Sequence, residues 1–112
     1  MELAPEFTWR SIGREAFRTW LEQFDQDASM GMAGGWTIHP VCWYLNDRDG
    51  GFWCMELTRN QVRLMDRHAL SPCFYVQTDW LLDFCWRLKK PDAYRCVDVA
   101  DCLAALSQVP EE

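Results

Sequence analysis

The sequence predicts an α+β fold: a small single domain in which a short mixed sheet, built around a β-hairpin, is packed by about four helices in the order αββαβαβα. Three observations favour this class. The chain of 112 residues suffices for one core. Its 49% hydrophobic and 25% charged residues are typical of globular domains. Segments with helical periodicity alternate with short aromatic and β-branched runs, and no repeat or linker divides residues 1–112.

The first element expected is an amphipathic helix over residues 9–28, where apolar side chains recur at helical spacing. Thr8 or Ser11 could cap it, and Arg18 is spaced to pair with Glu22. The Gly- and Met-rich residues 27–35 break this periodicity, so they are predicted to form a mobile loop.

The centre of the chain is predicted to be a β-hairpin, with strands over residues 36–45 and 52–57 around the turn-forming run "NDRDGG". Both faces of these strands are largely apolar, so one face packs on the core and the other needs cover from a helix or from a partner. The outer face and the turn are the first candidate contact surface. Its residues are Trp36, Ile38, Tyr44, Asp47, Arg48, Asp49 and Phe52.

The next segment is predicted to be a helix over residues 58–70, because Thr58 and Gln61 have the spacing of a capping box. Arg59, Arg63 and Arg67 recur at i, i+4 along it and form a basic stripe that an anionic group of this chain or another could complement. The stripe is therefore included among the candidate contacts.

The C-terminal part is predicted to contain a short strand over residues 73–77, a helix that starts at Asp79 and stops before Pro91, a strand over 94–97, and a helix capped by Asp98. This last helix runs to about Leu106. Residues 108–112 are expected to form a loose tail.

The helix that follows Asp79 is apolar over more than one face. Phe84 and Leu88 lead the expected core face, and Asp83 is spaced to pair with Arg87. Leu82 and Trp86 lie beyond that face, which makes them either a second core contact or an interface anchor.

Metal and cofactor sites are not expected. His39 and Cys42 have the spacing of half a zinc site, but no CxxC pair accompanies them, and residues three apart in a strand point to opposite faces. The central turn approaches the EF-hand pattern, but Leu45 stands at its first ligand position and offers no side-chain oxygen.

Thiol catalysis is also disfavoured. Cys85 and Cys102 share faces with apolar residues and are expected in the core. Cys73 with His68 is the remaining pair, and His68 in a last helical turn is more simply explained as a cation stabilised by the helix dipole. The protein is therefore expected not to be an enzyme; a small thiol- or metal-dependent enzyme using Cys73, His68 or His39 remains an alternative.

The net charge, the N-terminal sequence and the cysteine content together predict a cytoplasmic protein. A net charge of −6 and a pI near 4.8 disfavour direct nucleic-acid binding. The N-terminus has no signal-peptide pattern, and no apolar run is long enough to span a membrane. Six cysteines in such a chain are expected to be reduced thiols.

The sequence carries no motif of a recognised family. Its acidic, Trp-rich character favours a small protein that binds another protein stoichiometrically and inhibits it. Small bacterial immunity proteins and phage anti-defence proteins are similar in size and acidity, a similarity of composition alone. Mimicry of a polyanion that blocks a nucleic-acid-binding site is a second hypothesis, and a homodimer whose seam is the second apolar face is a third.

Overall fold

The computed structural model describes residues 12–67, 79–90 and 92–110, together with the backbone of residues 74–77. It confirms the α+β class, with helices packed around a β-hairpin, but the elements occur in a different order from the predicted αββαβαβα. They are α1 (Arg14–Leu21), β1 (Ser29–Met32), α2 (Pro40–Asp49), β2 (Trp53–Leu57), β3 (Val62–Asp66), β4 (Phe74–Gln77), α3 (Trp80–Lys89), β5 (Cys96–Asp98) and α4 (Val99–Gln108).

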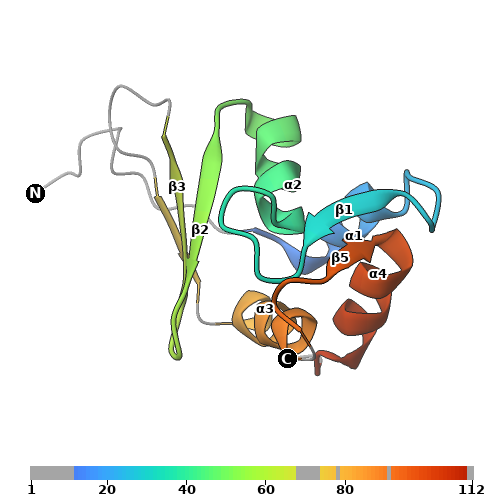
Figure 1. Ribbon diagram of the computed structural model, residues 1–112. Helices are drawn as coiled ribbons and strands as arrows, with labels where there is room; N and C mark the ends of the chain where they lie inside the picture. Colours follow the sequence, from blue (N-terminus) through green and yellow to red (C-terminus); the bar gives the residue numbers. More distant parts are fainter. Residues whose placement is uncertain (1–11, 68–73, 78, 91, 111–112) are drawn as a thin grey trace, which may run out of the picture.

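The described strands form two antiparallel sheets where one mixed sheet was expected (Figure 1). One sheet has the order β2-β3-β4, and β2 and β3 form a hairpin that pairs Trp53 with Asp66 and Leu57 with Val62. The other sheet joins β1 to β5 and contains an irregularity between Ser29 and Met32.

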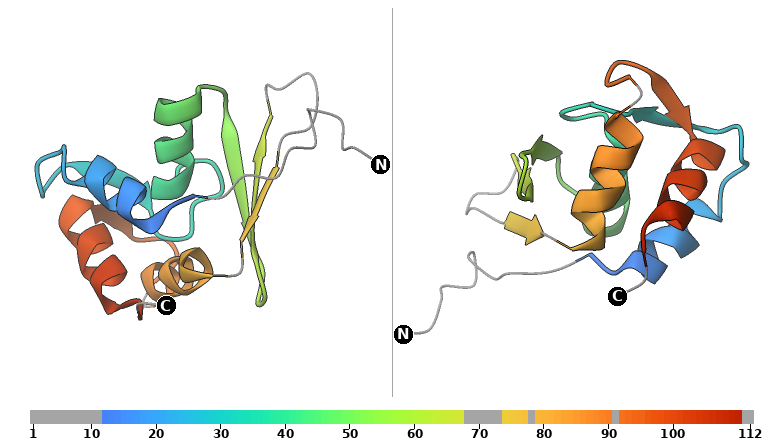
Figure 2. Two further views of the ribbon diagram at one scale, coloured as in Figure 1. Left: turned by 180° about the vertical axis from the view of Figure 1, so that it is seen from behind. Right: turned by 90° about the horizontal axis from the view of Figure 1, so that it is seen from below.

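The helices that the structure describes all lie on one face of the three-stranded sheet (Figure 1). Helices α2 and α3 lie next to this sheet, and α1, α4 and the β1–β5 pair lie farther from it, as Figure 2 also shows. The side chains that β2 and β3 turn toward the helices are buried: Trp53, Met55, Val62 and Leu64. The opposite face of the hairpin points away from the core.

The core is organised around aromatic rings. Phe17 of α1 is fully buried, and its ring lies 5.4 Å from that of Tyr44, 5.9 Å from Trp80 and 5.3 Å from Phe84, measured between centroids. The pairs with Tyr44 and Phe84 are edge-to-face, and such pairs add about 0.5–1.5 kcal/mol each beyond the burial of apolar area. Phe17 therefore joins α1, α2 and α3 at one point.

The predicted first strand of the hairpin, residues 36–45, is wrong: residues 40–49 form helix α2. His39 is its N-cap, with Nδ1 accepting from the backbone N–H of Val41 at 3.1 Å, and Pro40 occupies the first turn, where its missing N–H costs nothing. Gly50 follows the helix with a φ of 72°. The continuous apolar run hid these signals, since a helix buried on several sides has no clear period.

The predicted helix over residues 58–70 is also wrong where the structure describes it: residues 62–66 form strand β3. Thr58 accepts backbone N–H groups through its hydroxyl as expected, but the donors Asn60 and Gln61 close the turn of the β2–β3 hairpin. The same side-chain-to-backbone bond serves a turn as well as a helix start.

Two boundaries differ from expectation. Helix α1 ends at Leu21 rather than near residue 28, and four residues of the segment 27–35, predicted to be a loop, form β1.

At the C-terminus, Val109 is buried, and the guanidinium of Arg14 donates to the carbonyls of Leu106 and Val109 at 3.0 and 2.8 Å. This guanidinium adds hydrogen bonds at the C-terminal end of α4, where the carbonyl of Leu106 also accepts from the N–H of Val109.

The predicted starts of the last two helices are confirmed. The carboxylate of Asp79 accepts from the N–H of Leu81, and Asp98 forms a reciprocal capping box with Asp101. The strand predicted over residues 73–77 and the one predicted over 94–97 are present as β4 and β5.

Alanine substitutions at Gly31 and Gly50 test where the backbone is too close to another segment to accept a side chain. Both have positive φ, so Gly50→Ala should reduce the free energy of unfolding by about 1–3 kcal/mol through strain alone. A Cβ on Gly31 would also lie 1.7 Å from the carbonyl oxygen of Ile38, whereas one on Gly50 meets nothing within 4 Å. Gly31→Ala should therefore cost about 1–3 kcal/mol more, measured by urea denaturation, because backbone must move. Equal losses would contradict this placement.

Candidate functional site

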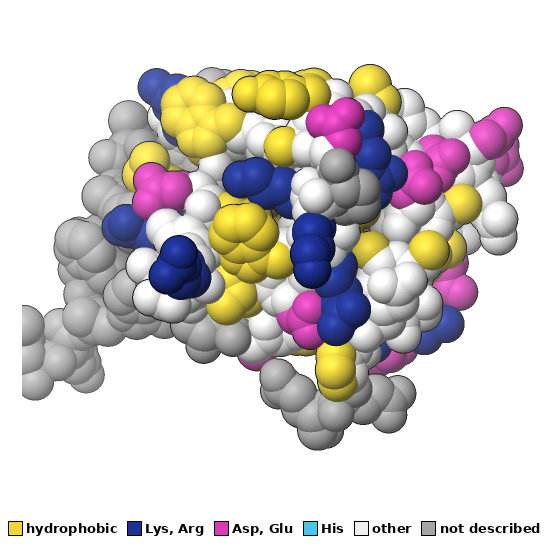
Figure 3. Space-filling view, turned by 60° about the horizontal axis from the view of Figure 1, so that its bottom comes forward, with side chains coloured by type: hydrophobic (Ala, Val, Ile, Leu, Met, Phe, Trp, Pro, Cys, Tyr) yellow, Lys and Arg dark blue, Asp and Glu magenta, His cyan; other side chains and the backbone are white. Residues whose placement is uncertain are grey.

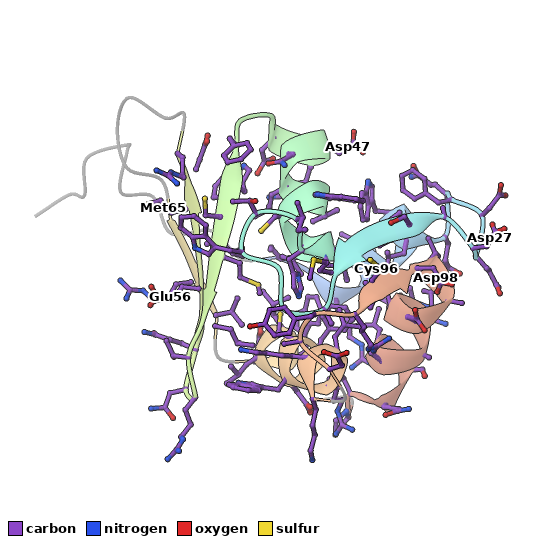
Figure 4. The ribbon with its side chains drawn as sticks, viewed as in Figure 1. Asp27, Asp47, Glu56, Met65, Cys96 and Asp98 are labelled. Carbon is purple, nitrogen blue, oxygen red and sulfur yellow. The ribbon has the colours of Figure 1, made fainter. Side chains whose placement is uncertain are left out.

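The candidate site is the face of the β2–β3 hairpin that points away from the helices, called here the outer sheet face. Glu56 and Met65 extend from this side of the sheet (Figure 4). Strand parity places alternate residues of the hairpin there, and the segment before α2 adds one more, because the carbonyl of Trp36 accepts from the N–H of Met55 at 2.8 Å. The face comprises Trp36, Phe52, Cys54, Glu56, Arg63, Met65 and Arg67.

Large apolar side chains are exposed on this face. Trp36 is 58% exposed, Met65 42% and Phe52 39%, and Cys54 is buried beside them. A shallow hollow of about 160 Å³ lies between Trp36 and Met65, with Leu64 among its lining residues. Clustered side chains of this kind mark a surface that another molecule can cover.

The charged groups of the outer sheet face border its apolar part. The guanidinium of Arg67 lies over the ring of Trp36, 5.3 Å from its centroid. Arg63 pairs with Glu56 across the hairpin at 3.4 Å, and both side chains are more than half exposed. An exposed pair of this kind contributes little to stability, so these groups are available to orient a partner.

The structure separates the predicted contact residues that were assigned to one hairpin. Tyr44 is buried against Phe17, and its hydroxyl accepts from Arg48 at 3.4 Å. Asp47 accepts from the indole N–H of Trp20 at 2.7 Å. Arg48 and Asp49 form an ion pair at 2.8 Å. These residues belong to α2, and Figure 4 shows Asp47 well apart from Glu56 and Met65.

Ile38 is exposed, but it lies in the segment before α2, where its carbonyl accepts from the N–H of Met32. Arg63 and Arg67 do share the outer sheet face, while Arg59 belongs to the hairpin turn and lines a hollow with Leu82 and Trp86. The predicted pairs Arg18–Glu22 and Asp83–Arg87 are confirmed.

Met65, Glu56 and Cys54 are members of the face that were not predicted as contacts. The available signal was the short alternation of Val62, Arg63 and Leu64, which is a strand pattern. The capping-box spacing of Thr58 and Gln61 predicts a helix over the same residues and so conflicts with this strand pattern.

His39 is fully buried, and burial lowers its pKa from 6.5 to about 3. Its Nδ1 accepts the N–H of Val41, so the neutral ring carries its proton on Nε2, which has no partner within the described structure. A histidine held neutral in this way is suited to capping α2 and is poorly suited to proton transfer near neutral pH.

Cys42, Cys85 and Cys102 are buried and protonated thiols. Burial raises the pKa of Cys42 and of Cys102 to about 12 and raises that of Cys85 as well. Cys42 donates to the carbonyl of Trp36, and Cys85 contacts the sulfur of Met55. Thiols of this kind are inert as nucleophiles. The alternative pair of Cys73 and His68 lies outside the described residues.

Within the described part of the chain, no group of three or more His, Cys, Asp or Glu side chains is placed to hold a metal ion. None of the helices described there combines the length and apolar character needed to cross a bilayer. Compared with known proteins, the chain matches no family model, no curated protein and no solved structure. Its function is therefore inferred from the chemistry of its own surface.

The neutral state of His39 makes stability depend on pH. Because its folded pKa of about 3 lies below the unfolded value of 6.5, the folded state loses stability as pH falls below 6.5, by about 1.4 kcal/mol per unit for this group. His39→Asn keeps an N-cap acceptor but does not titrate. Urea denaturation at a series of pH values should show a shallower acid loss in this variant. Parallel losses in the two proteins would contradict the assignment.

Thiol reactivity tests the packing of the cysteines. In a Cys73→Ser background, Cys96, which is exposed, should react rapidly with a thiol reagent, whereas Cys42, Cys85 and Cys102 should react only on unfolding. Peptide mapping by mass spectrometry identifies the labelled residues, and Cys96→Ser should remove the rapid phase. Rapid labelling of Cys85 in the native protein would show that the core is packed differently.

Proposed function

We propose that this protein binds another protein stoichiometrically through the outer sheet face and inhibits it by occlusion, as a small cytoplasmic accessory protein of the immunity or anti-defence type. The observation that carries the proposal is the cluster of exposed Trp36, Phe52 and Met65 around Arg67. Aromatic residues, Met and Arg are the types enriched at protein interfaces, and Trp and Arg dominate binding hot spots.

The construction of the face supports binding. Hairpin pairing from Trp53 to Leu57 and from Val62 to Asp66 fixes the backbone beneath it, and the inner side of the same strands is packed on the core. The contact between Arg67 and Trp36 orders both side chains before a partner arrives. A surface ordered in advance loses less entropy on association.

The neutral state of the buried histidine and thiols supports a binding protein over a thiol enzyme. The described groups with clearly shifted pKa values are His39, Cys42, Cys85 and Cys102, and burial holds each of them in its neutral form. Free thiols in the core also favour a reducing compartment, in agreement with the proposed cytoplasmic location.

Affinity capture tests the proposal. The full chain, immobilised and exposed to lysate of its native source, should retain one protein to saturation at an equimolar ratio, and the purified partner should lose its activity when saturated. Trp36→Ala should weaken binding by about thirtyfold, the effect of losing a hot spot of about 2 kcal/mol. Phe24→Ala is the matched control, since Phe24 is as exposed as Phe52 but follows α1 on the other side of the molecule.

The outcomes separate the rival functions. Absence of a saturable partner, or equal binding by Trp36→Ala and wild type, would overturn the proposal. Binding that weakens steeply with salt and competes with nucleic acid would indicate polyanion mimicry. Sedimentation that shows a dimer dissociated by Trp36→Ala would assign the face to self-association.

A further inference from the structure

A second candidate surface lies on α3, where two hollows meet beside Trp86. The indole N–H of Trp86 donates to the carbonyl of Thr58 at 3.1 Å, so the helix is tied to the turn of the β2–β3 hairpin. Trp86 and Asp83 lie between two hollows of about 460 and 790 Å³. The smaller hollow is lined by Arg59 from the turn and by Leu82 and Pro110, and the larger by Lys90. We call the two hollows together the α3 groove.

Around the α3 groove the cations Arg59, Arg87, Lys89 and Lys90 outnumber Asp79 and Asp83, although the chain as a whole is acidic. Within the described part of the chain, Arg59, Lys89 and Lys90 have no acidic partner within ion-pair distance. The ammonium of Lys89 instead lies over the ring of Trp86, 5.1 Å from its centroid, and that ring is 38% exposed. Figure 3 shows hydrophobic side chains interleaved with Lys and Arg on the side that carries α3 and the hairpin turn.

We propose that the α3 groove binds an acidic segment of a partner protein, in which carboxylates alternate with apolar side chains. Arg59 and Lys90 line the groove and Lys89 lies over the Trp86 ring. These three side chains would receive the carboxylates, since none of them has an acidic partner among the described residues. Trp86 and Leu82 would receive the apolar side chains. Charge complementarity and a central tryptophan together provide orientation and affinity. Lys89 also lines a hollow with Trp36 and Glu56, so this surface borders the outer sheet face. The inference is argued from the contacts of α3 and does not depend on the proposed function.

A protein segment fits the groove better than a nucleic acid does. Asp79 and Asp83 line the smaller hollow, and a continuous row of phosphates could not avoid them. A peptide can place its carboxylates near the three cations and uncharged residues near the two aspartates, so its spacing can match the groove.

Fluorescence anisotropy of the full chain with a labelled peptide of alternating Glu and Leu tests this inference. A second peptide carries Gln in place of every Glu, and labelled oligothymidylate represents the competing class. The Glu peptide should bind about tenfold more tightly than the Gln peptide, and the double variant Lys89→Glu/Lys90→Glu should remove about this difference, as expected for charge contacts at a partly exposed surface. Arg18→Glu is the control, because it reverses a cation on α1 outside the groove.

Thermal denaturation first confirms that the double variant is folded, and Lys89→Gln/Lys90→Gln, with an intermediate effect expected, replaces it if it is not. Equal affinity for the two peptides, or an equal loss in Arg18→Glu and the groove variant, would overturn the inference. Tighter binding of oligothymidylate than of the Glu peptide would also overturn it and would assign the groove to nucleic acid. Met65→Ala, which alters the outer sheet face at a residue that does not line the hollow of Lys89, should leave peptide binding unchanged, so failure here is distinguishable from failure of the outer sheet face.

Discussion

The packing of Phe17 is the contact on which the rest of the structure depends. This one ring touches Tyr44 of α2 and Trp80 and Phe84 of α3, so three helices separated in sequence are fixed relative to one another. Nearby hydrogen bonds hold the same arrangement, since Trp20 donates to Asp47 and Trp80 donates to the carbonyl of Ile12. A chain of 112 residues has little core to spare, and large rings supply much buried area from few positions.

This helical core determines which sheet face is open. Helices α2 and α3 cover the inner side of the β2–β3 hairpin, α4 packs on the β1–β5 pair, and α1 packs against α4. No described helix is left for the outer side, where Trp36 and Met65 are exposed. The outer sheet face therefore results from the distribution of helices, and its apolar residues are the part of the surface that the fold itself does not use.

The sequence predicted the fold class and the elements whose start is determined locally, but it did not predict the central topology. Asp79 and Asp98 cap their helices as expected, because a carboxylate and the next few N–H groups suffice for a cap. Arg59, Arg63 and Arg67 misled because a spacing of four residues places side chains on one face of a helix and also on one face of a strand. Likewise Tyr44, predicted at a surface, is buried by Phe17 and Trp20, contacts that no local pattern reveals.

The tryptophans show how one residue type serves both the core and the surface. Trp20, Trp53 and Trp80 are buried, and each indole N–H finds an acceptor in another part of the chain or in a nearby turn. Trp86 keeps this hydrogen bond, to Thr58, yet leaves part of its ring exposed beside Lys89. Trp36 is exposed further and contacts Arg67. The ring that helps to hold α3 against the hairpin is thus also part of a surface, so the groove inherits the rigidity of the core beneath it.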